Sequence, residues 1–461
     1  MKHNLILNTD SYKASHYLQY PSGSEYVSSY IECRGGQFPE AVFFGLQAFV
    51  KEYLLQPIST ADIAAAETLL HQHGLPFHRA GWEHIVAAHG GLLPLEISAV
   101  AEGTPVPSHN VMLQMVNTCP ACFWLTSYME TALLRAIWYP TTVATQSREI
   151  KKRIAGFLRE TADNLEGLPF KLHDFGARGA TSQESAMLGG MAHLVNFQGT
   201  DTVAGLVAAR RFYAADMAGH SIPAAEHCTM TAWGREREVD AYANMLDRFA
   251  GPGKTLAVVS DSYDLWHAIE NLWGGKLRSR VVNTGGTLVL RPDSGDPVAI
   301  VTESLERLMR IFGFCENTRG YRVLPDFIRV IQGDGVSRHS IPKILQAMKE
   351  RKISADNITF GMGGELLQKL DRDVMNFAMK ASAIRINGHW QPIYKDPVTD
   401  PEKKSKRGRL ALTVDDRGKL YTVAATALGG RNNLLRPVFR NGTLLISTNF
   451  AEIRHLARID Q

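Results

Sequence analysis

The stretch Thr287–Pro297 combines the pattern of a buried strand with charged side chains that could take part in chemistry. It reads TLVLRPDSGDP, so a short apolar run is followed by Arg291, Asp293 and Asp296. Parallel α/β proteins bind ligands at the carboxyl ends of their strands, where these side chains would lie. The carboxylates could bind Mg²⁺ or a sugar hydroxyl, and Arg291 could bind an anion. The alternative is a common Asp/Ser/Gly turn that caps the next helix.

The same arrangement recurs along the chain from Lys171 onward. Six or seven apolar runs end in the turns HDFGARG (173–179), NFQGTD (196–201), IPAAEHCT (222–229), VVSDSYD (258–264), LRPDSGD (290–296), VIQGDG (330–335) and FGMGG (360–364). Because a helical stretch follows each turn, the series predicts an irregular parallel α/β barrel whose strands all end at one mouth. That mouth would gather Asp174, Arg178, Asp201, His227, Asp261, Arg291, Asp293, Asp334 and Gly363.

His227 follows one of these predicted strands, beside Glu226 in the sequence AEHCT. The next two strand ends carry Asp261 and Asp293. Either carboxylate could orient one ring nitrogen of His227 and leave the other free as a nucleophile or base. The alternative is a histidine with a purely structural role.

Phe175, Arg178 and Asp201 are expected on the opposite wall of the same site. An aromatic face beside a cation and an anion suits a flat, polar heteroaromatic ring. Asp201 could accept a hydrogen bond from an amide N–H, and it would repel a carboxylate at close range.

The last two turns, GDG (333–335) and GMGG (361–364), are the candidates for phosphate binding. Barrels often bind phosphate on the loops after their last strands, where glycine lets backbone N–H groups approach phosphate oxygens. The second turn is followed by the helical stretch ELLQKLDRDV, and Lys369, Arg372 and Lys380 are near by in the sequence.

Composition narrows the class of protein. The 461 residues are enough for two domains, and their 45% hydrophobic content is ordinary for a globular protein. No apolar run approaches the roughly 18 residues of a membrane helix, and the start MKHNLILNTDSYK does not resemble a secretory signal.

A net charge of +4 favours small anionic ligands over nucleic acid. Five scattered cysteines fit a reducing cytoplasm, and we interpret the pair Cys119 and Cys122 as core packing.

We expect three segments. Residues 1–165 form an α+β segment, 166–383 form the catalytic barrel, and 384–461 form a β-rich segment that packs beside the first. Within the first, helices are expected at 42–73, with a helix start at Ser59–Asp62, an antiparallel β module at 92–118 and a helical block at 123–161. The basic run 403–409 is expected to be a solvated loop.

Taken together, the motifs resemble the nicotinamide phosphoribosyltransferase family. They are DSYKASHYLQYP, IECRGG, LHDFGARGATSQES, VNFQGTDTVAG, SIPAAEHCTMTAWG, VVSDSYD, LRPDSGDP, IQGDG and GMGGELLQKLDRD. The resemblance covers nearly the whole chain and keeps the family's order. It implies a type II phosphoribosyltransferase fold and the condensation of nicotinamide with 5-phosphoribosyl-1-pyrophosphate to nicotinamide mononucleotide and pyrophosphate. It also implies Mg²⁺, stimulation by ATP, and a homodimer with active sites at the interface. From the composition we expect a cytoplasmic protein without nucleic-acid or membrane partners.

The resemblance further implies roles for individual residues. His227 matches the histidine that ATP phosphorylates, Asp261 the carboxylate paired with it, and Asp293 the acid at the ribose and metal. Phe175 and Tyr12 match the aromatic pair around the pyridine ring, and Asp201 matches the acceptor for its amide. Tyr12 and Asp10 match residues that the partner subunit lends. The other pocket residues are matched by Arg178, Ser221 and Arg291, and the ribose and phosphate contacts by Arg34, Gly333, Asp334, Gly363, Gly364, Arg372 and Lys380.

Some features depart from the family pattern. The segment after Arg34 is shorter than in animal members, the carboxyl end is trimmed, and Ala257 stands where some members carry Ser. Three alternatives stay open: a nicotinate or quinolinate phosphoribosyltransferase, a barrel aldolase or isomerase, and a non-catalytic signalling protein on the same fold. The first would need a basic pocket in place of Asp201, and the second a strand-end Lys or His/Glu pair.

Overall fold

A computed structural model describes residues 4–400 and 403–459. The chain forms two compact units. The terminal unit comprises the described part of Met1–Thr145, together with Ala209–Ala215 and Asp371–Arg458. The barrel unit comprises Gln146–Ala208 and Asp216–Leu370, with the described end of the chain.

The barrel unit is built on a six-stranded parallel sheet in the order β7-β6-β13-β12-β9-β8. Its strands are β6 (Leu172–Asp174), β7 (Gly199–Thr200), β8 (Thr255–Val259), β9 (Thr287–Arg291), β12 (Ile328–Gln332) and β13 (Ile358–Met362). Each of them immediately precedes or overlaps one of the turns expected from the sequence. The parallel register sets Val259 beside Arg291 and Met362 beside Asp174, so the carboxyl ends of these strands share one edge.

The two outer strands of this sheet are joined by the segment 220–225. His220 makes a parallel bridge to Gly199 of β7, and Ala224 makes one to Ala257 of β8. The main-chain hydrogen bond from Ala257 N to the Pro223 oxygen, 2.9 Å long, belongs to the second bridge. The barrel is therefore closed by single-residue bridges, which confirms the irregular parallel α/β barrel expected from the sequence.

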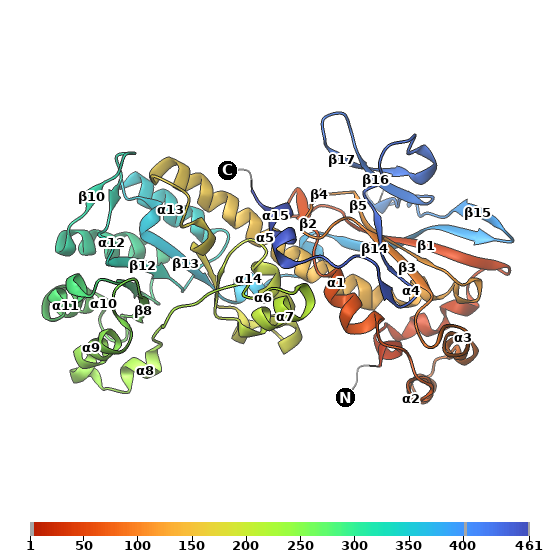
Figure 1. The fold of residues 1–461 in the computed structure, drawn as a ribbon, viewed down its shortest axis with the longest axis horizontal. Coiled ribbons are helices and arrows are strands. Elements are labelled where there is room, and N and C mark those ends of the chain that lie inside the picture. The colour runs from red at the N-terminus through yellow and green to blue at the C-terminus, as the bar shows by residue number, and fades with distance from the viewer. Residues whose placement is uncertain (1–3, 401–402, 460–461) are drawn as a thin grey trace. The chain divides into compact units, whose positions relative to one another are not determined.

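Helices surround the parallel strands, as Figure 1 shows for α9, α12 and α13. The helices of this unit are α6 (Gln183–His193), α8 (His227–Thr231), α9 (Glu238–Phe249), α10 (Leu265–His267), α11 (Arg278–Asn283), α12 (Pro297–Phe312), α13 (Ser340–Glu350) and α14 (Gly364–Leu367). Two further helices, α5 (Glu130–Thr161) and α7 (Val203–Tyr213), belong to both units. Asp296 caps α12 by accepting from Ala299 N at 2.9 Å, and Pro297 occupies the first turn. The capping role expected for this turn thus belongs to Asp296.

The interior of the barrel is apolar below the strand ends. Ala257, Val289 and Ile331, from three neighbouring strands, form a buried cluster, and Phe175 and Ile222 pack against it. The residues on either side of them in each strand are buried as well, because helices cover the outer face of a parallel sheet. This double burial explains why the strands read as continuous apolar runs.

The terminal unit contains a seven-stranded antiparallel sheet in the order β15-β14-β1-β5-β3-β18-β19. Its strands are β1 (Ser24–Cys33), β3 (Leu95–Ala99), β5 (Val111–Asn117), β14 (Phe377–Ile386), β15 (His389–Pro392), β18 (Arg436–Arg440) and β19 (Thr443–Leu444). Strands β2 (Glu40–Val42) and β4 (Pro105–Pro107) form a separate pair, as do β16 (Leu410–Val414) and β17 (Leu420–Ala424). Segments from both ends of the sequence therefore share one sheet, and the antiparallel module expected at 92–118 is part of it.

Helices of the terminal unit include α1 (Leu46–Phe49), α2 (Thr60–Gln72), α3 (Arg79–His89), α4 (Leu125–Tyr128) and α15 (Phe450–Ala457). The capping box expected at Ser59 and Asp62 is present, and α2 and α3 lie side by side (Figure 1). The sequence prediction described the tail only as β-rich and missed α15, whose own capping box joins Asn449 and Glu452. Among the described residues, no helix has the length and apolar character needed to cross a membrane.

Candidate active site

A cavity of about 460 Å³ opens at the carboxyl ends of the barrel strands. Its walls come from the segments that follow β6, β7, the bridging segment and β9. Six of the residues predicted at the site line it: Phe175, Arg178, Asp201, His227, Arg291 and Asp293. All belong to the barrel unit, so the structure brings together the ring-binding and the ribose-binding candidates of that unit.

His227 is held between two carboxylates. Its Nε2 lies 3.0 Å from Asp261 Oδ1, and its Nδ1 lies 3.9 Å from Asp293 Oδ2. The Asp261 side chain is only 4% exposed, whereas that of His227 is 45% exposed. The second oxygen of Asp261 accepts hydrogen bonds from Asp293 N at 3.0 Å and from Ser294 Oγ at 2.5 Å. A buried, fixed carboxylate therefore orients one ring nitrogen and leaves Nδ1 on the open side.

Arg291 and Asp293 form an ion pair beside this histidine. Arg291 donates from Nη2 and Nε to Asp293 Oδ1 at 2.8 and 3.2 Å. A Cβ atom on Gly333 would lie 3.2 Å from this oxygen and 3.3 Å from Arg291 Nε. The absence of a side chain at Gly333 thus lets the next strand end approach the pair closely. Asp334, which follows it, is exposed.

The Phe175 ring lies over Gly361 of β13. A Cβ atom on Gly361 would come within 1.9 Å of the ring, so only glycine fits there. Arg291 lies on the ring as well, with its guanidinium carbon 5.3 Å from the ring centroid. Gly363 is close to the same loop, because a Cβ on it would lie 3.8 Å from the Phe175 carbonyl oxygen, and Gly364 begins the short α14.

Asp201 is the anionic group of the opposite wall. Its Oδ1 lies 3.1 Å from His173 Nε2 and 2.5 Å from Ser221 Oγ. Partial burial alone would raise the pKa of Asp201, but the hydrogen bonds from His173 and Ser221, together with the charges of His173 and Arg291, lower it overall. Asp201 therefore remains a carboxylate under neutral conditions.

Sequence reasoning missed two positioning groups. His173 holds Asp201, and Ser294 holds Asp261. Both stand inside turns already identified as strand ends, HDFGARG and LRPDSGD, so a search of those turns for hydrogen-bond donors could have found them. Cys228, also unpredicted, lines the cavity and donates to Glu226 Oε1 at 2.6 Å.

Five predicted site residues belong to the terminal unit: Asp10, Tyr12, Arg34, Arg372 and Lys380. Asp10 accepts from Thr131 Oγ1 at 2.6 Å, and Tyr12 is 57% exposed. Arg34 pairs with buried Glu32 at 2.9 Å, while its Nη2 is buried and makes no hydrogen bond to any described residue. Burial lowers the pKa of Lys380, and Arg372 is exposed. Their roles at the site stay predictions.

The basic run was expected to be a solvated loop, but one of its lysines is engaged. Lys406 Nζ forms an ion pair with Glu32, the partner of Arg34, and Lys406 N donates to Tyr30 Oη at 2.8 Å. Two cations thus share one buried carboxylate at the end of β1.

Asp293 fits the role of Mg²⁺ ligand implied by the resemblance. Its Oδ1 is occupied by Arg291, whereas its Oδ2 accepts no hydrogen bond from the described residues and faces the ring of His227 at 3.9 Å. Carboxylate oxygen is the donor type that Mg²⁺ prefers. Asp261, by contrast, has both oxygens engaged.

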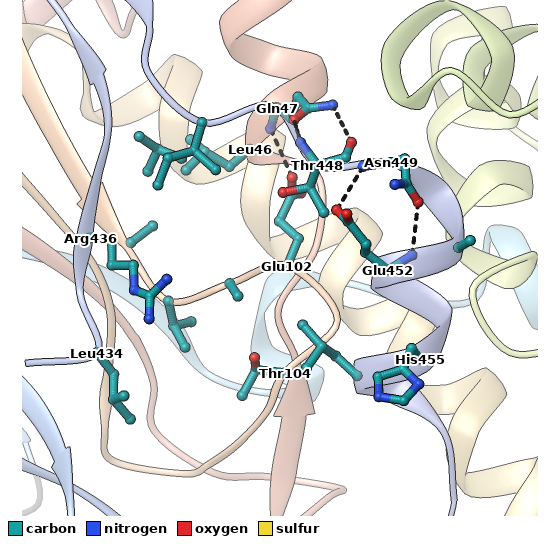
Figure 2. Close-up of a pocket in the computed structure, with 17 residues that line it drawn as sticks. Leu46, Gln47, Glu102, Thr104, Leu434, Arg436, Thr448, Asn449, Glu452 and His455 are labelled. Atoms are coloured by element: carbon teal, nitrogen blue, oxygen red, sulfur yellow. Dashed lines mark hydrogen bonds between the residues drawn. The ribbon is translucent and has the colours of Figure 1, made fainter. Parts of the chain in front are cut away.

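A second cavity, of about 750 Å³, lies within the terminal unit (Figure 2). Two of its polar side chains are paired with the protein: Gln47 Nε2 donates to the Thr448 oxygen at 2.9 Å, and Glu102 accepts from Tyr213 Oη at 2.9 Å. Burial raises the pKa of Glu102 to about 7, although hydrogen bonds from Tyr213 and from the backbone of Gly45 and Gln47 oppose the shift. The pairing indicates a structural role for these groups.

Two family profiles match the chain. The profile described as the nicotinate phosphoribosyltransferase (NAPRTase) family covers residues 170–443, and that of the nicotinamide phosphoribosyltransferase N-terminal domain covers residues 4–97. The solved nicotinate-nucleotide pyrophosphorylase of Pyrococcus furiosus has a similar fold, with a TM-score of 0.63 and 16% identity over 98% of this chain and 95% of that one. Human nicotinic acid phosphoribosyltransferase gives a TM-score of 0.59 and 17% identity over 97% and 92%.

Curated relatives are similar along their whole length. The nicotinamide phosphoribosyltransferase of Xanthomonas campestris pv. campestris is 52% identical over 98% of this chain and 97% of its own. That of Acinetobacter baylyi is 31% identical over 96% and 95%. The closed barrel and its rim of acids, cations and an aromatic ring define the class, which is that of the type II phosphoribosyltransferases. Within that class, the chain belongs to the nicotinamide phosphoribosyltransferase family.

Proposed function

We propose that this enzyme transfers the phosphoribosyl group of 5-phosphoribosyl-1-pyrophosphate to the ring nitrogen of nicotinamide. The bond between the anomeric carbon and the pyrophosphate oxygen breaks, and pyrophosphate leaves with the electron pair. The ring nitrogen supplies the pair for the new bond, which yields nicotinamide mononucleotide for NAD biosynthesis. The observation that carries the choice of substrate is Asp201, an ionised group held by His173 and Ser221 in the cavity wall.

The pyridine ring would stack on Phe175, whose position is set by Gly361 beneath it and Arg291 beside it. Asp201 would accept a hydrogen bond from the carboxamide N–H, and Arg178 and Ser221 would complete the pocket. A carboxylate on the ring would face Asp201 instead and be repelled. The stack also holds the ring nitrogen toward the ribose, which is a positioning contribution to rate.

Ribose and phosphates would lie along the neighbouring strand ends. Asp293 would hold the ribose and, with its free Oδ2, a Mg²⁺ ion, which neutralises charge on the departing pyrophosphate when bound. Developing positive charge on the ribose is favoured by the nearby carboxylates. The groups proposed for phosphate and ribose contacts are Arg34, Gly333, Asp334, Gly363, Gly364, Arg372 and Lys380.

ATP would stimulate the reaction by phosphorylating His227. The geometry supports Nδ1 as the nucleophile, because Asp261 engages Nε2 at 3.0 Å. The imidazole nitrogen attacks the γ-phosphorus, the bond to the bridging oxygen breaks, and ADP leaves with that electron pair. Hydrolysis of the phosphohistidine regenerates the imidazole.

A homodimer would complete each site. Asp10 and Tyr12 lie near the start of the terminal unit, and Tyr12 exposes 57% of its surface, which is high for an aromatic side chain. We propose that this ring stacks on the nicotinamide bound by the partner subunit, opposite Phe175. Mixing a Tyr12→Ala subunit with a His227→Ala subunit tests this: restored ATP-stimulated activity supports shared sites, and no restoration in verified mixed dimers contradicts them.

A cytoplasmic location is in keeping with five free cysteines.

One assay tests the proposed reaction. Purified enzyme with 5-phosphoribosyl-1-pyrophosphate and Mg²⁺ is offered nicotinamide or nicotinate, and the mononucleotide formed is followed by chromatography. We expect nicotinamide mononucleotide to dominate strongly. A preference for nicotinate, the substrate named in the NAPRTase family description, would instead support the second candidate function, nicotinate phosphoribosyl transfer. Formation of neither product would support a non-catalytic protein.

A further inference from the structure

A histidine and two cysteines meet in the terminal unit, outside the groups used above. His84 comes from α3, and Cys119 and Cys122 come from the turn that follows β5. One ring nitrogen of His84 and the two sulfur atoms all lie within 4.8 Å of one another, and His84 Nε2 is 3.3 Å from Cys119 Sγ. Both cysteines are free thiols. The sequence alone indicated core packing for this pair and gave no link to His84.

These separations suit a single thiophilic ion. Zinc binds sulfur at about 2.3 Å and nitrogen at about 2.0–2.1 Å, so a tetrahedral ion separates its ligand atoms by roughly 3.5–3.8 Å. The distance between His84 Nε2 and Cys119 Sγ is close to that value. Two thiolates and an imidazole select Zn²⁺ over hard ions such as Mg²⁺, which prefer oxygen.

The turn that carries the sulfur atoms is fixed before any ion binds. Asn117 Nδ2 donates to the Cys119 carbonyl oxygen at 2.8 Å, and Asn117 Oδ1 accepts from Val27 N of β1 at 2.8 Å. Asn117 is 1% exposed, so these bonds are shielded from water. The sheet therefore holds the Cys-x-x-Cys turn facing α3, which reduces the ordering that ion binding would require.

A neighbouring histidine provides an independent observation. His89 lies on the same helix, with its ring 5.6 Å from that of His84. Its Nε2 is inaccessible to water and makes no hydrogen bond to any described residue. Buried polar atoms rarely lack a partner. His89 is not among the residues whose ligand atoms lie within 4.8 Å of one another, so water would fill the fourth coordination position of an ion, next to a ring that lacks a partner.

We propose that His84, Cys119 and Cys122 bind a Zn²⁺ ion that ties α3 to the end of β5. Binding converts two thiols to thiolates and releases two protons, with no change of oxidation state. The ion links His84 to cysteines 35 and 38 positions further along the chain and stabilises this part of the terminal unit. None of the three ligands lines the cavity at the barrel strand ends or is among the residues proposed for ribosyl transfer, so the role is structural.

The test uses the full chain purified without a histidine tag. Elemental analysis measures bound zinc, and replacement by Co²⁺ gives thiolate-to-cobalt charge-transfer absorption together with the intense visible bands of a tetrahedral ion. We expect a single equivalent per chain. Cys119→Ser, Cys122→Ser and His84→Ala are each expected to weaken binding by more than about 100-fold, since even outer-shell changes cost up to that much. Cys315→Ser and His71→Ala, at exposed positions, are the matched controls and keep wild-type binding.

A second measurement covers variants that fail to fold. In the wild type, Zn²⁺ should protect the partly exposed Cys119, but not exposed Cys315, from alkylation by iodoacetamide, and should raise the unfolding temperature of chelator-treated protein. The proposal is overturned if the reduced wild type binds no Zn²⁺ or Co²⁺, or if the ligand variants bind as the wild type does. It is also overturned if mass spectrometry of protein purified without reductant shows Cys119 and Cys122 joined as a disulfide and reduction does not create an ion site.

Discussion

Asp261 joins two strand ends through one buried carboxylate: Oδ1 lies 3.0 Å from His227 Nε2, and Oδ2 accepts from the backbone nitrogen of Asp293 at 3.0 Å. The carboxylate therefore orients the histidine and fixes the start of the turn that carries Asp293. A change at Asp261 would disturb both, whereas a change at His227 removes the imidazole alone.

The first prediction follows from this difference. His227→Ala should reduce the rate with ATP to the rate without ATP and leave slow synthesis of the mononucleotide, because the turn at Asp293 keeps its bond to Asp261. The measurement is the rate of product formation with and without ATP, with radiolabelled ATP to detect the phosphoenzyme. His71→Ala, at an exposed position, is the control. Continued stimulation of the His227 variant by ATP would exclude this histidine as the phosphorylated group.

Asp261→Asn should lower both rates, the stimulated and the unstimulated. The amide carries no negative charge to stabilise the imidazole. In addition, its NH2 group must face either His227 Nε2 or Asp293 N, each of which donates to the carboxylate in the wild type, so one hydrogen bond is lost. We expect a loss of roughly 10-fold or more in the unstimulated rate, since an unpaired buried donor costs about 1–3 kcal/mol. An unstimulated rate equal to that of the wild type would contradict the dual role of Asp261.

The choice between an amide and a carboxylate on the pyridine ring is expected to depend on Asp201. Asp201→Asn should relax the preference for nicotinamide over nicotinate by roughly 10- to 100-fold, which corresponds to about 1–3 kcal/mol. The physical reason is the loss of a negative charge that the hydrogen bonds from His173 and Ser221 keep ionised. The readout is the ratio of kcat/KM for the two substrates. Asp326→Asn, a fully exposed carboxylate of the same unit, serves as control, and an unchanged ratio at Asp201 would remove it from this role.

The fold could be read from the sequence because each barrel strand ends in a recognisable turn. The residues of those turns, Asp201, His227, Asp261 and Asp293, lie at one rim as expected, because parallel strands fix which end each turn occupies. The strand expected before the turn IPAAEHCT (222–229) does not form, because this segment makes only single-residue bridges, which a short apolar pattern cannot distinguish from a strand.

Contacts that depend on long-range register were also hidden in the sequence. The approach of His84 to Cys119 joins segments 35 positions apart, and the packing of Phe175 over Gly361 joins two strand ends far apart in the chain. The helix α15 was missed because it is only eight residues long, and its buried apolar residues Phe450, Ile453 and Ala457, although at helical spacing, are too few to stand out in a tail rich in strands. The capping box at Asn449 was the signal that could have revealed it.

Gly361→Ala should impair binding of the pyridine ring. A methyl group there would lie 1.9 Å from the Phe175 ring, so the ring must move away from its place against the barrel core. We expect KM for nicotinamide to rise by roughly 2- to 10-fold, because aromatic stacking contributes about 0.5–1.5 kcal/mol. Gly156→Ala is the matched control, since no atom lies near its added methyl group. An unchanged KM in folded Gly361→Ala enzyme would show that Phe175 does not support the substrate.

The last prediction concerns stability and Glu102. Burial raises the pKa of this carboxyl group from 4.5 to about 7 in the folded protein. The folded state therefore holds its proton more tightly than the unfolded state, so the contribution of Glu102 to the free energy of unfolding falls as pH rises from about 4.5 through about 7. The full difference corresponds to about 3 kcal/mol.

Glu102→Gln isolates this contribution, because the amide stays neutral throughout. We compare the free energy of unfolding of the variant with that of the wild type at each pH. The difference, variant minus wild type, should increase by up to about 3 kcal/mol between about pH 4.5 and pH 8. The loss of an acceptor oxygen adds only an offset that does not depend on pH. Urea midpoints measured at matched pH values give the difference. Glu83→Gln, on an exposed side chain, should show no such rise. A difference that is flat with pH would mean that Glu102 is already ionised in the folded protein at low pH, with Gly45 N and Tyr213 Oη holding a charge.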